Sequence, residues 1–380
     1  MRIGIDARFI TRLPRRGIGT YSLNLVSNLV STFPNHEFFL YIYHCDNEKL
    51  FKLNNNVHIR KIPVPTYFFW EQVGLPIAAF RDKLDMLHCL GNTAPIFLPK
   101  CIPLILTVHD VMFMQTGKFI PSPVTLYQKA GRLYRSFFTP LAISKARKII
   151  TISDYSKKDI LQFLPQISPN KIIVIHLGCD PIFENPKIAP SQISNDSPFI
   201  FCLGAEDPRK NTMTVVRAFI QLISESPSIA NLNLIIVGYK NLLNSPEYKE
   251  SVNAGVSSRV KFFNYISTME LACLYKSAVA FVYPSYYEGF GIPLLEAFNM
   301  GCPVIASSAT SIPEVGGCAP LYFNPNNHDE LLKLIKKIIE NESLRKSMIE
   351  NGLVIARNYS WNVIAKKTEE TYRIATKEFV

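Results

Sequence analysis

The chain has 380 residues, of which 48% are hydrophobic and 19% are charged. This length exceeds one compact core and suits two domains, and the composition excludes an intrinsically disordered protein. No apolar run is long enough for a membrane span, and the opening segment carries charges where a secretory signal would be apolar. We therefore expect a folded, two-domain protein of the cytoplasm.

Cysteine usage argues against a disulfide framework and against structural zinc. The 8 cysteines are scattered, without a C-x-x-C pair and without histidines at metal-ligand spacing. We expect them to be reduced core residues, and we expect no metal site.

Positive charge is concentrated in the first half of the chain. Residues 1–175 contain 22 Lys and Arg against 10 Asp and Glu, whereas residues 176–380 contain 19 against 20. A positive face attracts nucleic acid, anionic lipid headgroups or anionic substrates. Because zinc-finger, basic-zipper and RNP-like motifs are absent from the sequence, a membrane surface or a phosphate-bearing acceptor ranks above nucleic acid.

The first expected strand, residues 2–6, leads into a loop that carries Gly17 and Gly19 and then into a helix. Glycine lets the backbone approach a phosphate group closely. An ordinary strand-to-helix turn is the more common setting for two glycines, and the phosphate loop is the alternative.

Two later segments of the first half combine apolar and surface features. The aromatic run from Tyr67 to Trp70 is expected to lie in the core, with an exposed lip on a membrane or a lipid-linked acceptor as the alternative. Residues 127–148 are expected to form a helix in which Arg132 and Arg135 alternate with apolar side chains. This pattern is typical of a membrane-surface helix or of a solvated helix face.

A buried-strand pattern over residues 103–108 ends at His109 and Asp110. Catalytic side chains of parallel sheets lie at the carboxyl ends of strands. Asp110 is placed to orient the imidazole, which makes His109 a catalytic candidate; a structural histidine is the alternative.

Residues 179–198 contain prolines at 181, 186, 190 and 198 and have no apolar period, which predicts an interdomain linker. The strand expected next, residues 199–204, precedes Arg209 and Lys210 and a further helix. Two cations at a strand end beside a helix N-terminus suit a diphosphate, although a surface pair is the ordinary alternative.

Residues 280–307 read as strand, loop, helix and strand, one right-handed βαβ unit of a parallel sheet. The loop runs through Glu288, Gly289, Phe290 and Gly291, and Glu296 lies about one turn into the helix. Glycines and free helix N–H groups favour a phosphate here. The two carboxylates are either ligand contacts or solvated surface charges.

The segment PSYYEGFGIPLLEAFNMGCPV resembles the paired-glutamate motif of the retaining glycosyltransferases of glycosyltransferase family 4, also called group 1. The segments GIDAR, WEQ, HDVMF and PRKN resemble, in particular, bacterial mannosyltransferases of O-antigen and exopolysaccharide synthesis. The resemblance implies an α/β protein of the GT-B fold, with two Rossmann-like, doubly wound parallel-sheet domains facing a cleft. Residues 1–178 would form the acceptor domain, 179–198 the linker, 199–358 the donor domain, and 359–380 a helix that crosses back to the first domain.

The resemblance also implies a reaction. A hexose would move from a nucleotide-diphosphate sugar, GDP-mannose being favoured over a UDP-hexose, to a glycan or lipid-linked acceptor. His109 would contact the transferred sugar, and Arg209 and Lys210 would neutralise the leaving diphosphate. Glu288 would bind hydroxyls of the donor sugar, and Glu296 those of the ribose.

Further donor contacts follow from the same resemblance. Backbone groups of Tyr265 and Ile266 would meet the nucleobase, and the loop with Gly17 and Gly19 would face the diphosphate. The chain departs from the commoner family pattern at Ala205, where an arginine is widespread, which leaves open how the charge divides between the two cations that follow.

The D-x-D motif of metal-dependent glycosyltransferases is absent from the sequence. We therefore expect no metal and no cofactor beyond the donor, with a location in the cytoplasm or at the inner face of the cell membrane. A sugar-nucleotide epimerase and a non-catalytic sugar-nucleotide-binding protein are the alternatives, and the second would be expected to have lost one of the proposed site residues.

Overall fold

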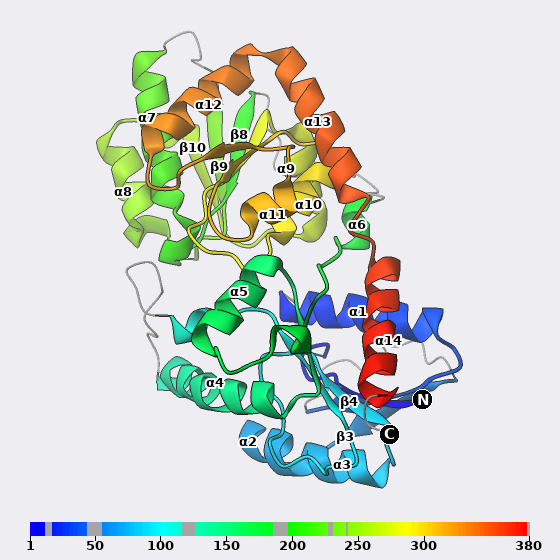
Figure 1. The fold of residues 1–380 in the computed structure, drawn as a ribbon. Helices are drawn as coiled ribbons and strands as arrows, with labels where there is room; N and C mark the ends of the chain where they lie inside the picture. The colour runs from blue at the N-terminus through cyan, green and yellow to red at the C-terminus, as the bar shows by residue number, and fades with distance from the viewer. Residues whose placement is uncertain are drawn as a thin grey trace. The chain divides into compact units, whose positions relative to one another are not determined.

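The computed structural model describes the chain except for residues 12–16, 44–54, 116–125, 185–196, 227–230, 241 and 378–380. The described residues form two compact units. The first comprises Met1–Gln115, Ser122–Gly178 and Ser360–Val380, and the second contains Cys179–Tyr359. Each unit has its own parallel sheet with helices packed on it (Figure 1). Most of the segment expected to be a linker lies outside the described residues.

The first sheet has seven strands in the order β3-β2-β1-β4-β5-β6-β7, all parallel. Its strands are β1 (Arg2–Asp6), β2 (Glu37–Ile42), β3 (Val57–Lys61), β4 (Met86–Cys89), β5 (Leu104–Val108), β6 (Lys148–Thr151) and β7 (Ile172–Val174). The strand order reverses between β1 and β4, where Ile5 pairs with His88. In such sheets the crevice for a ligand lies outside the carboxyl ends of the strands at this switch point.

The helices of the first unit cover a sheet whose central strands are fully buried, as in β5, where every residue is apolar or Thr. They are α1 (Ile18–Thr32), α2 (Tyr67–Phe69), the π-helical turn η2 (Trp70–Gly74), α3 (Leu75–Arg81), the 3-10 turns η3 (Met112–Met114) and η4 (Pro169–Lys171), α4 (Leu126–Lys145), α5 (Asp154–Phe163) and α14 (Trp361–Lys377). α5 begins at Ser153, whose hydroxyl accepts a hydrogen bond from the Ser156 N–H, as an N-cap does.

The last helix, α14, belongs to the first unit and crosses α1, against which it packs (Figure 1, red and blue). The Tyr372 hydroxyl lies 2.7 Å from Nδ1 of the buried His88 on β4. Gly178 leaves room for Trp361, because a Cβ there would lie 2.8 Å from the indole nitrogen. The expectation that the C-terminal helix returns to the first domain is confirmed.

The second sheet has six parallel strands in the order β10-β9-β8-β11-β12-β13. They are β8 (Phe199–Leu203), β9 (Asn233–Val237), β10 (Val260–Phe263), β11 (Ala280–Tyr283), β12 (Val304–Ser307) and β13 (Leu321–Phe323). The order reverses between β8 and β11. Both sheets therefore show the doubly wound topology that the resemblance implied.

The helices of the second unit include the expected helix between β11 and β12. They are α6 (Pro181–Glu184), α7 (Thr212–Glu225), α8 (Pro246–Asn253), α9 (Thr268–Ser277), α10 (Ile292–Asn299), α11 (Ile312–Gly316), α12 (His328–Glu340), α13 (Glu342–Ala356) and the 3-10 turns η5 (Pro208–Lys210), η7 (Leu242–Asn244) and η8 (Ser257–Arg259). Gly301, with φ of 64°, follows α10 in the left-handed conformation in which helices commonly end. Among the described residues, no helix is both long and apolar enough to cross a bilayer.

Candidate active site

The switch point of the second sheet is built by two loops that are tied together. Asn211, which ends the loop after β8 in a left-handed conformation (φ 51°), donates its side-chain amide to the carbonyls of Pro284 and Pro325 at 3.1 and 2.8 Å. The backbone N–H of Tyr286, on the loop after β11, donates to the carbonyl of Arg209 at 2.7 Å. These bonds fix the side chains of one loop against those of the other.

The two loops bring Lys210 and Glu288 into contact. Lys210 Nζ lies 2.7 Å from Glu288 Oε1, and the two side chains are 25% and 15% exposed. Burial alone would raise the pKa of the Glu288 carboxyl, but Lys210 and the hydroxyl of Ser285 hold that pKa below its usual value. The site therefore contains a charged pair at neutral pH.

Two residues of the loop after β12 bind the backbone around Glu288. The Glu288 N–H donates to the Thr310 hydroxyl at 3.1 Å, and the Ser311 hydroxyl lies 2.9 Å from the Glu288 carbonyl and 2.8 Å from that of Phe290. The ring of Phe290 is buried against Tyr359, so this residue supports the loop by its ring.

Two glycines flank Phe290 on this loop. Gly291 has φ of 117° immediately before α10, a conformation that side chains rarely adopt. Gly289 follows Glu288 directly, so the loop keeps a backbone without side chains on either side of Phe290.

Glu296 lies on α10 and accepts a hydrogen bond from the Tyr275 hydroxyl at 3.1 Å. Burial raises the pKa of its carboxyl to about 7, and the nearby Asp180 adds to this effect, while Tyr275 and Lys210 oppose it. Glu296 is therefore divided between its neutral and charged forms near pH 7, in contrast to the ionised Glu288.

Arg209 takes a different direction from Lys210. Its guanidinium is bonded to the carboxylate of Asp207, with Nη2 2.6 Å from Oδ2. Its charge still contributes to the lowered pKa of Glu288, after that of Lys210. Lys210 makes the 2.7 Å contact with the glutamate, whereas the guanidinium of Arg209 pairs with Asp207.

Two other features lie at the same edge of the second sheet. A cavity of about 550 Å³ between the loops after β8 and β9 is lined by residues that include Asp207, Asn211 and Tyr239. Tyr265, which is 57% exposed, and the half-buried Ile266 follow the edge strand β10. The residues expected at the nucleobase therefore follow the same end of the strands as those expected at the diphosphate.

His109 follows β5 in the first unit and is buried. Its Nε2 lies 2.9 Å from the Leu90 carbonyl, which can only accept, so Nε2 carries the proton and Nδ1 is the acceptor. Burial lowers the pKa of the imidazole, which is neutral at pH 7. The Asn92 side chain and the Ser156 hydroxyl hold its backbone N–H and carbonyl, at 2.8 and 3.1 Å.

The expectation that Asp110 orients the imidazole is wrong. The Asp110 carboxylate accepts the backbone N–H of Met112 at 3.1 Å, as in an Asx turn, and the Leu90 carbonyl orients the ring of His109 instead. Adjacent positions at a strand end point to opposite faces, which is why the neighbour in sequence is not the partner in space.

Of the glycine loop in the first unit, Gly17 and Gly19 are described and residues 12–16 are not. Gly17 has φ of 46° and precedes α1, and Gly19 is buried in the first turn of that helix. The left-handed conformation explains why a glycine stands at position 17.

A buried network of charged residues, which the sequence did not predict, lies at the switch point of the first sheet. Arg8 contacts Asp6 at 3.1 Å and Glu71 at 2.6 Å, and these side chains are 4%, 0% and 0% exposed. The hydroxyls of Tyr67, Thr93 and Tyr134 also bond Glu71. The sequence does contain a signal for this network, because the GIDAR and WEQ segments place charged residues among apolar ones.

The ionisation of this network follows from its burial. Burial raises the pKa of Asp6 to about 6 in spite of Arg8. For Glu71, burial is outweighed by Arg8 and the hydroxyl donors, which hold its pKa below the usual value.

The aromatic run and the basic helix differ in part from expectation. Trp70 is buried, as expected for a core residue, but Phe68 and Phe69 are 44% and 50% exposed, so the core assignment is wrong for these two residues. Arg132 donates to the carbonyls of Phe113 and Gln115 at 3.1 and 2.9 Å and is therefore a structural residue.

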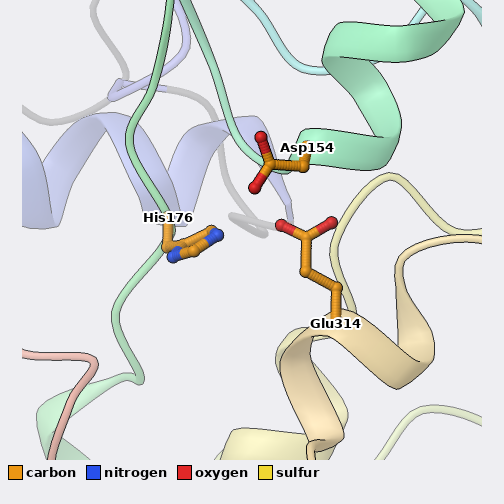
Figure 2. A group of neighbouring side chains, drawn as sticks. All are labelled: Asp154, His176 and Glu314. Atoms are coloured by element: carbon orange, nitrogen blue, oxygen red, sulfur yellow. The ribbon is translucent and has the colours of Figure 1, made fainter.

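Three further titratable side chains are labelled in Figure 2. Asp154 opens α5 and His176 follows β7, both in the first unit, while Glu314 lies in the first turn of α11 in the second unit. An acidic side chain in the first turn of a helix interacts favourably with the helix dipole, so Asp154 stabilises α5 and Glu314 stabilises α11.

Two family models match the chain over most of its length. Residues 15–182 match the family model described as Glycosyltransferase Family 4, and residues 184–354 match the model described as Glycosyl transferases group 1. Together the two models span most of both units.

Two curated relatives are mannosyltransferases by name. The chain is 26% identical to O-antigen chain mannosyltransferase B of Escherichia coli over 96% of this chain and 97% of that protein. It is 29% identical to the MMP alpha-(1->4)-mannosyltransferase of Mycolicibacterium hassiacum over 79% of this chain and 72% of that protein.

Solved structures share the fold at low sequence identity. The structure of Anabaena HepE in complex with UDP-glucose superposes with a TM-score of 0.68 at 16% identity, covering 98% of this chain and 99% of that one. With two doubly wound parallel sheets, a returning C-terminal helix and a family model matched to each half, the chain belongs to glycosyltransferase family 4, group 1, and is a glycosyltransferase of the GT-B fold.

Proposed function

We propose that the protein transfers a hexose from a nucleotide-diphosphate sugar to a glycan or lipid-linked acceptor in surface polysaccharide synthesis, with retention of anomeric configuration. GDP-mannose is the proposed donor. The observation that carries the proposal is the contact between Lys210 and Glu288, a charged pair fixed at the switch point of the second sheet.

The pair suits the bond that must break. When the bond between the anomeric carbon and the diphosphate oxygen breaks, negative charge grows on the diphosphate and positive charge on the sugar. Lys210 stabilises the first, and the ionised Glu288 binds hydroxyls of the sugar beside it. Because the sugar and the β-phosphate are directly joined in the donor, groups that bind them are expected at one end of the sheet, as these two side chains are. The acceptor oxygen then bonds the anomeric carbon, and its proton passes to the departing diphosphate.

The other site residues take supporting roles in the proposal. Glu296 accepts the ribose hydroxyls, a role that its charged form fills better than its neutral form. The backbone of Gly289 and Gly291 approaches the phosphates, and the neutral His109 offers Nδ1 to a hydroxyl of the transferred sugar. Lys210, with Arg209 behind it, supplies the positive charge that a divalent metal supplies in other transferases, so the reaction is proposed to need no metal.

The donor is tested by binding and hydrolysis. Thermal shift and slow donor hydrolysis are measured for the full chain with GDP-mannose, UDP-glucose, UDP-galactose and UDP-N-acetylglucosamine, with EDTA present. A ligand at 100 times its Kd stabilises the folded state by about 2.7 kcal/mol, which a melting curve resolves. We expect stabilisation by GDP-mannose and persistence of activity in EDTA.

Other outcomes have defined meanings. Stabilisation by UDP-glucose alone would favour the second candidate, a UDP-hexose-dependent transferase. This candidate is suggested by the similarity in fold to Anabaena HepE, whose structure contains UDP-glucose. Loss of activity in EDTA, restored by Mg²⁺, would contradict the metal-free proposal. Binding without turnover, even with acceptor extracts, would indicate a sugar-nucleotide-binding protein.

We also propose that the first unit rests on an anionic membrane surface at the inner face of the cell membrane. Large apolar side chains of α2, α3 and α4 are exposed, among them Phe68 (44%), Phe80 (61%), Leu133 (73%) and Phe137 (62%). The ring centroids of Phe68 on α2 and Phe138 on α4 are 5.9 Å apart, so the apolar side chains of the two helices form one patch. The surplus of Lys and Arg in residues 1–175 favours anionic lipid.

Vesicle co-sedimentation tests this partner. We expect binding to phosphatidylglycerol vesicles, weaker binding as salt increases, and little binding to phosphatidylcholine. Replacing Phe68 and Phe137 by Ser should weaken binding, whereas Leu243→Ser, which changes a residue of the second unit that is 69% exposed, should not. Equal binding of all variants to the vesicles would show that the apolar patch does not contact the membrane.

A further inference from the structure

A continuous chain of hydrogen bonds crosses the interior of the first unit, from its last helix to its first. The Tyr372 hydroxyl of α14 lies 2.7 Å from Nδ1 of His88 on β4. Nε2 of His88 lies 2.8 Å from the Thr107 hydroxyl of β5, and that hydroxyl lies 3.2 Å from the Tyr21 hydroxyl of α1. None of the four residues is more than 3% exposed. Elements that are distant in the sequence therefore meet through buried polar groups.

This chain ends beside His109. The ring centroids of Tyr21 and His109 are 4.8 Å apart and the ring planes meet at 89°, the edge-to-face arrangement that aromatic pairs prefer. Thr107 and His109 are two positions apart at the end of β5, so their side chains leave the same face of the sheet. Tyr21 therefore bonds Thr107 with its hydroxyl and contacts His109 with its ring.

The hydrogen bond to His109 fixes its tautomer but not the tilt of its ring. Nε2 donates to the Leu90 carbonyl at 2.9 Å, and a single bond of this kind leaves the imidazole free to rotate about the bond axis. The ring of Tyr21, which meets the imidazole at a right angle, restricts that rotation. The tilt matters because it sets the direction of Nδ1, the atom proposed above to accept a hydroxyl of the transferred sugar.

Each member of the chain has the donors and acceptors that its neighbours need. Burial lowers the pKa of His88 to about 3, so its imidazole is neutral at pH 7. A neutral imidazole donates from one nitrogen and accepts at the other, and a hydroxyl both donates and accepts. Hydrogen bonds in such a buried chain strengthen one another, and an unpaired member costs free energy. The position of Tyr21 is therefore coupled to the groups behind it.

We infer that Tyr21 is a positioning residue for His109, and that Thr107, His88 and Tyr372 hold it in place. The C-terminal helix would thus contribute to the site of the first unit through a residue that touches no substrate. Apolar side chains could anchor α14 without enclosing polar groups, so a polar chain at this place favours a functional role over simple packing. The inference rests on the proposed function for the part of His109 in transfer, whereas the orientation of its ring does not depend on it.

Thr107, at the centre of the chain, allows the sharpest pair of variants. Thr107→Val keeps nearly the same shape but removes the hydroxyl that His88 and Tyr21 share. Thr107→Ser is the matched control, because it keeps the hydroxyl and loses only a buried methyl group. The serine variant should melt at a lower temperature than the wild type and still orient His109. Stability and positioning are thereby separated.

Tyrosine-to-phenylalanine variants test the two ends of the chain. Tyr21→Phe keeps the ring beside His109 and removes its bond to Thr107, and it serves as a second variant if the valine protein does not fold. Tyr372→Phe removes the hydroxyl contributed by α14. Tyr41→Phe is the control, since it removes a buried tyrosine's bond to Asp82, at 2.9 Å, elsewhere in the same unit.

The first measurement is NMR of the full chain labelled with ¹⁵N-histidine. The chain has 7 histidines, and His109→Gln identifies the signals of His109. We expect these ring signals to shift in Thr107→Val and Tyr21→Phe, and to shift in the same direction but less in Tyr372→Phe. They should keep their wild-type positions in Thr107→Ser and Tyr41→Phe.

The second measurement is steady-state kinetics with the donor found by screening. We expect kcat to fall about tenfold in Thr107→Val and Tyr21→Phe, because small errors in the placement of a reacting group are costly. Thr107→Ser should keep the wild-type kcat. The Kd of GDP or UDP should be unchanged in every variant, since the chain holds the group proposed to contact the sugar and none proposed to contact the nucleotide.

Two results would overturn the inference. It fails if the His109 signals are the same in wild type, Thr107→Val and Tyr21→Phe. It also fails if the signals shift while kcat stays constant, because the orientation of the ring would then not affect transfer. If the wild type turns over none of the nucleotide sugars, the proposed function fails instead, and the NMR comparison alone decides whether the chain orients His109.

Discussion

The two sheets carry buried charges at corresponding places, yet they treat them differently. At the switch point of the first sheet, Arg8 is enclosed by two carboxylates and is 4% exposed. At that of the second, Lys210 contacts one carboxylate and keeps 25% of its side chain exposed. Glu296, on the helix that follows, is held by the hydroxyl of Tyr275 and has a pKa raised to about 7.

In the proposed function, this difference is one between a scaffold and a reaction site. A cation that two carboxylates neutralise can orient neighbouring rings but has little charge left for a ligand. A cation with a single partner and solvent access can meet a diphosphate when one arrives. A carboxyl near its pKa at pH 7 can become charged when ligand hydroxyls are offered to it. The contrast predicts stability effects from the first set and catalytic effects from the second.

The largest effect is expected for Arg8→Met. Removing the guanidinium leaves Asp6 and Glu71 buried without a cation, which should lower the free energy of unfolding by about 3–5 kcal/mol. Urea denaturation measures it. Arg60→Met, which breaks a 3.2 Å pair with Asp82 at a side chain 43% exposed, is the control and should cost at most about 1 kcal/mol. Similar losses in both variants would show that burial of the network is unimportant.

Lys210→Ala should lower kcat by a factor of about 100–1,000, because a cation beside the proposed leaving group is lost, and should lower the melting temperature slightly, because the largely buried Glu288 loses its partner. Steady-state kinetics with the donor found by screening gives the value. Lys336→Ala removes a 2.6 Å pair with Glu225 on the surface of the same unit and should keep full activity. An unaltered kcat in Lys210→Ala would show that Lys210 does not stabilise the leaving diphosphate.

Arg209→Ala sharpens the comparison within the second unit. The guanidinium is bonded to Asp207 and acts on the site through its charge, so we expect a fall in kcat of about tenfold or less, smaller than that of Lys210→Ala. Kinetics of the two variants side by side decide the order. The reverse order would mean that Arg209 leaves Asp207 for the diphosphate.

Glu296→Gln should change the pH dependence of stability. The folded pKa is about 7 and the ordinary value is 4.5, so folding favours the protonated carboxyl. Its stabilising contribution is complete below about pH 4.5 and is lost as the pH rises through about 7. We expect the melting temperature of the variant, relative to wild type, to be higher at pH 8 than at pH 5.

Two controls accompany the Glu296 experiment. Glu340→Gln, at an exposed position of α12, should give the same difference at both pH values. Glu296→Gln should also weaken nucleotide binding at pH 8, since a neutral amide is a poorer partner for ribose hydroxyls. A melting difference that is constant with pH would contradict the raised pKa.

Much of the fold was open to prediction because its signals are local. The strand before His109 and the unit that carries Glu288 and Glu296 follow from apolar runs with glycine and proline at their ends, and the structure has both. Parallel topology then places strand ends at one edge. That argument is enough to predict which loops carry the site.

The partners within the site were harder to predict because they come from contacts between distant residues. Glu71 meets Arg8 across 63 positions, through the π-helical turn that turns it inward. The ring of His109 is oriented by a carbonyl of the neighbouring strand end, where the sequence suggested the adjacent Asp110. No periodicity reports such pairs.

The place of α14 in the first unit has a consequence for how the chain is made. The ribosome delivers β1 to β7 before the second unit and α14 after it, yet Tyr372 bonds His88 across 284 positions. The surface of α1 that packs against α14 therefore has no partner while the second unit is synthesised. A nascent chain can complete its second-made unit before its first, which reverses the usual N-to-C order of domain folding. Premature termination shortly before Trp361 would leave the second unit intact and the first unfinished.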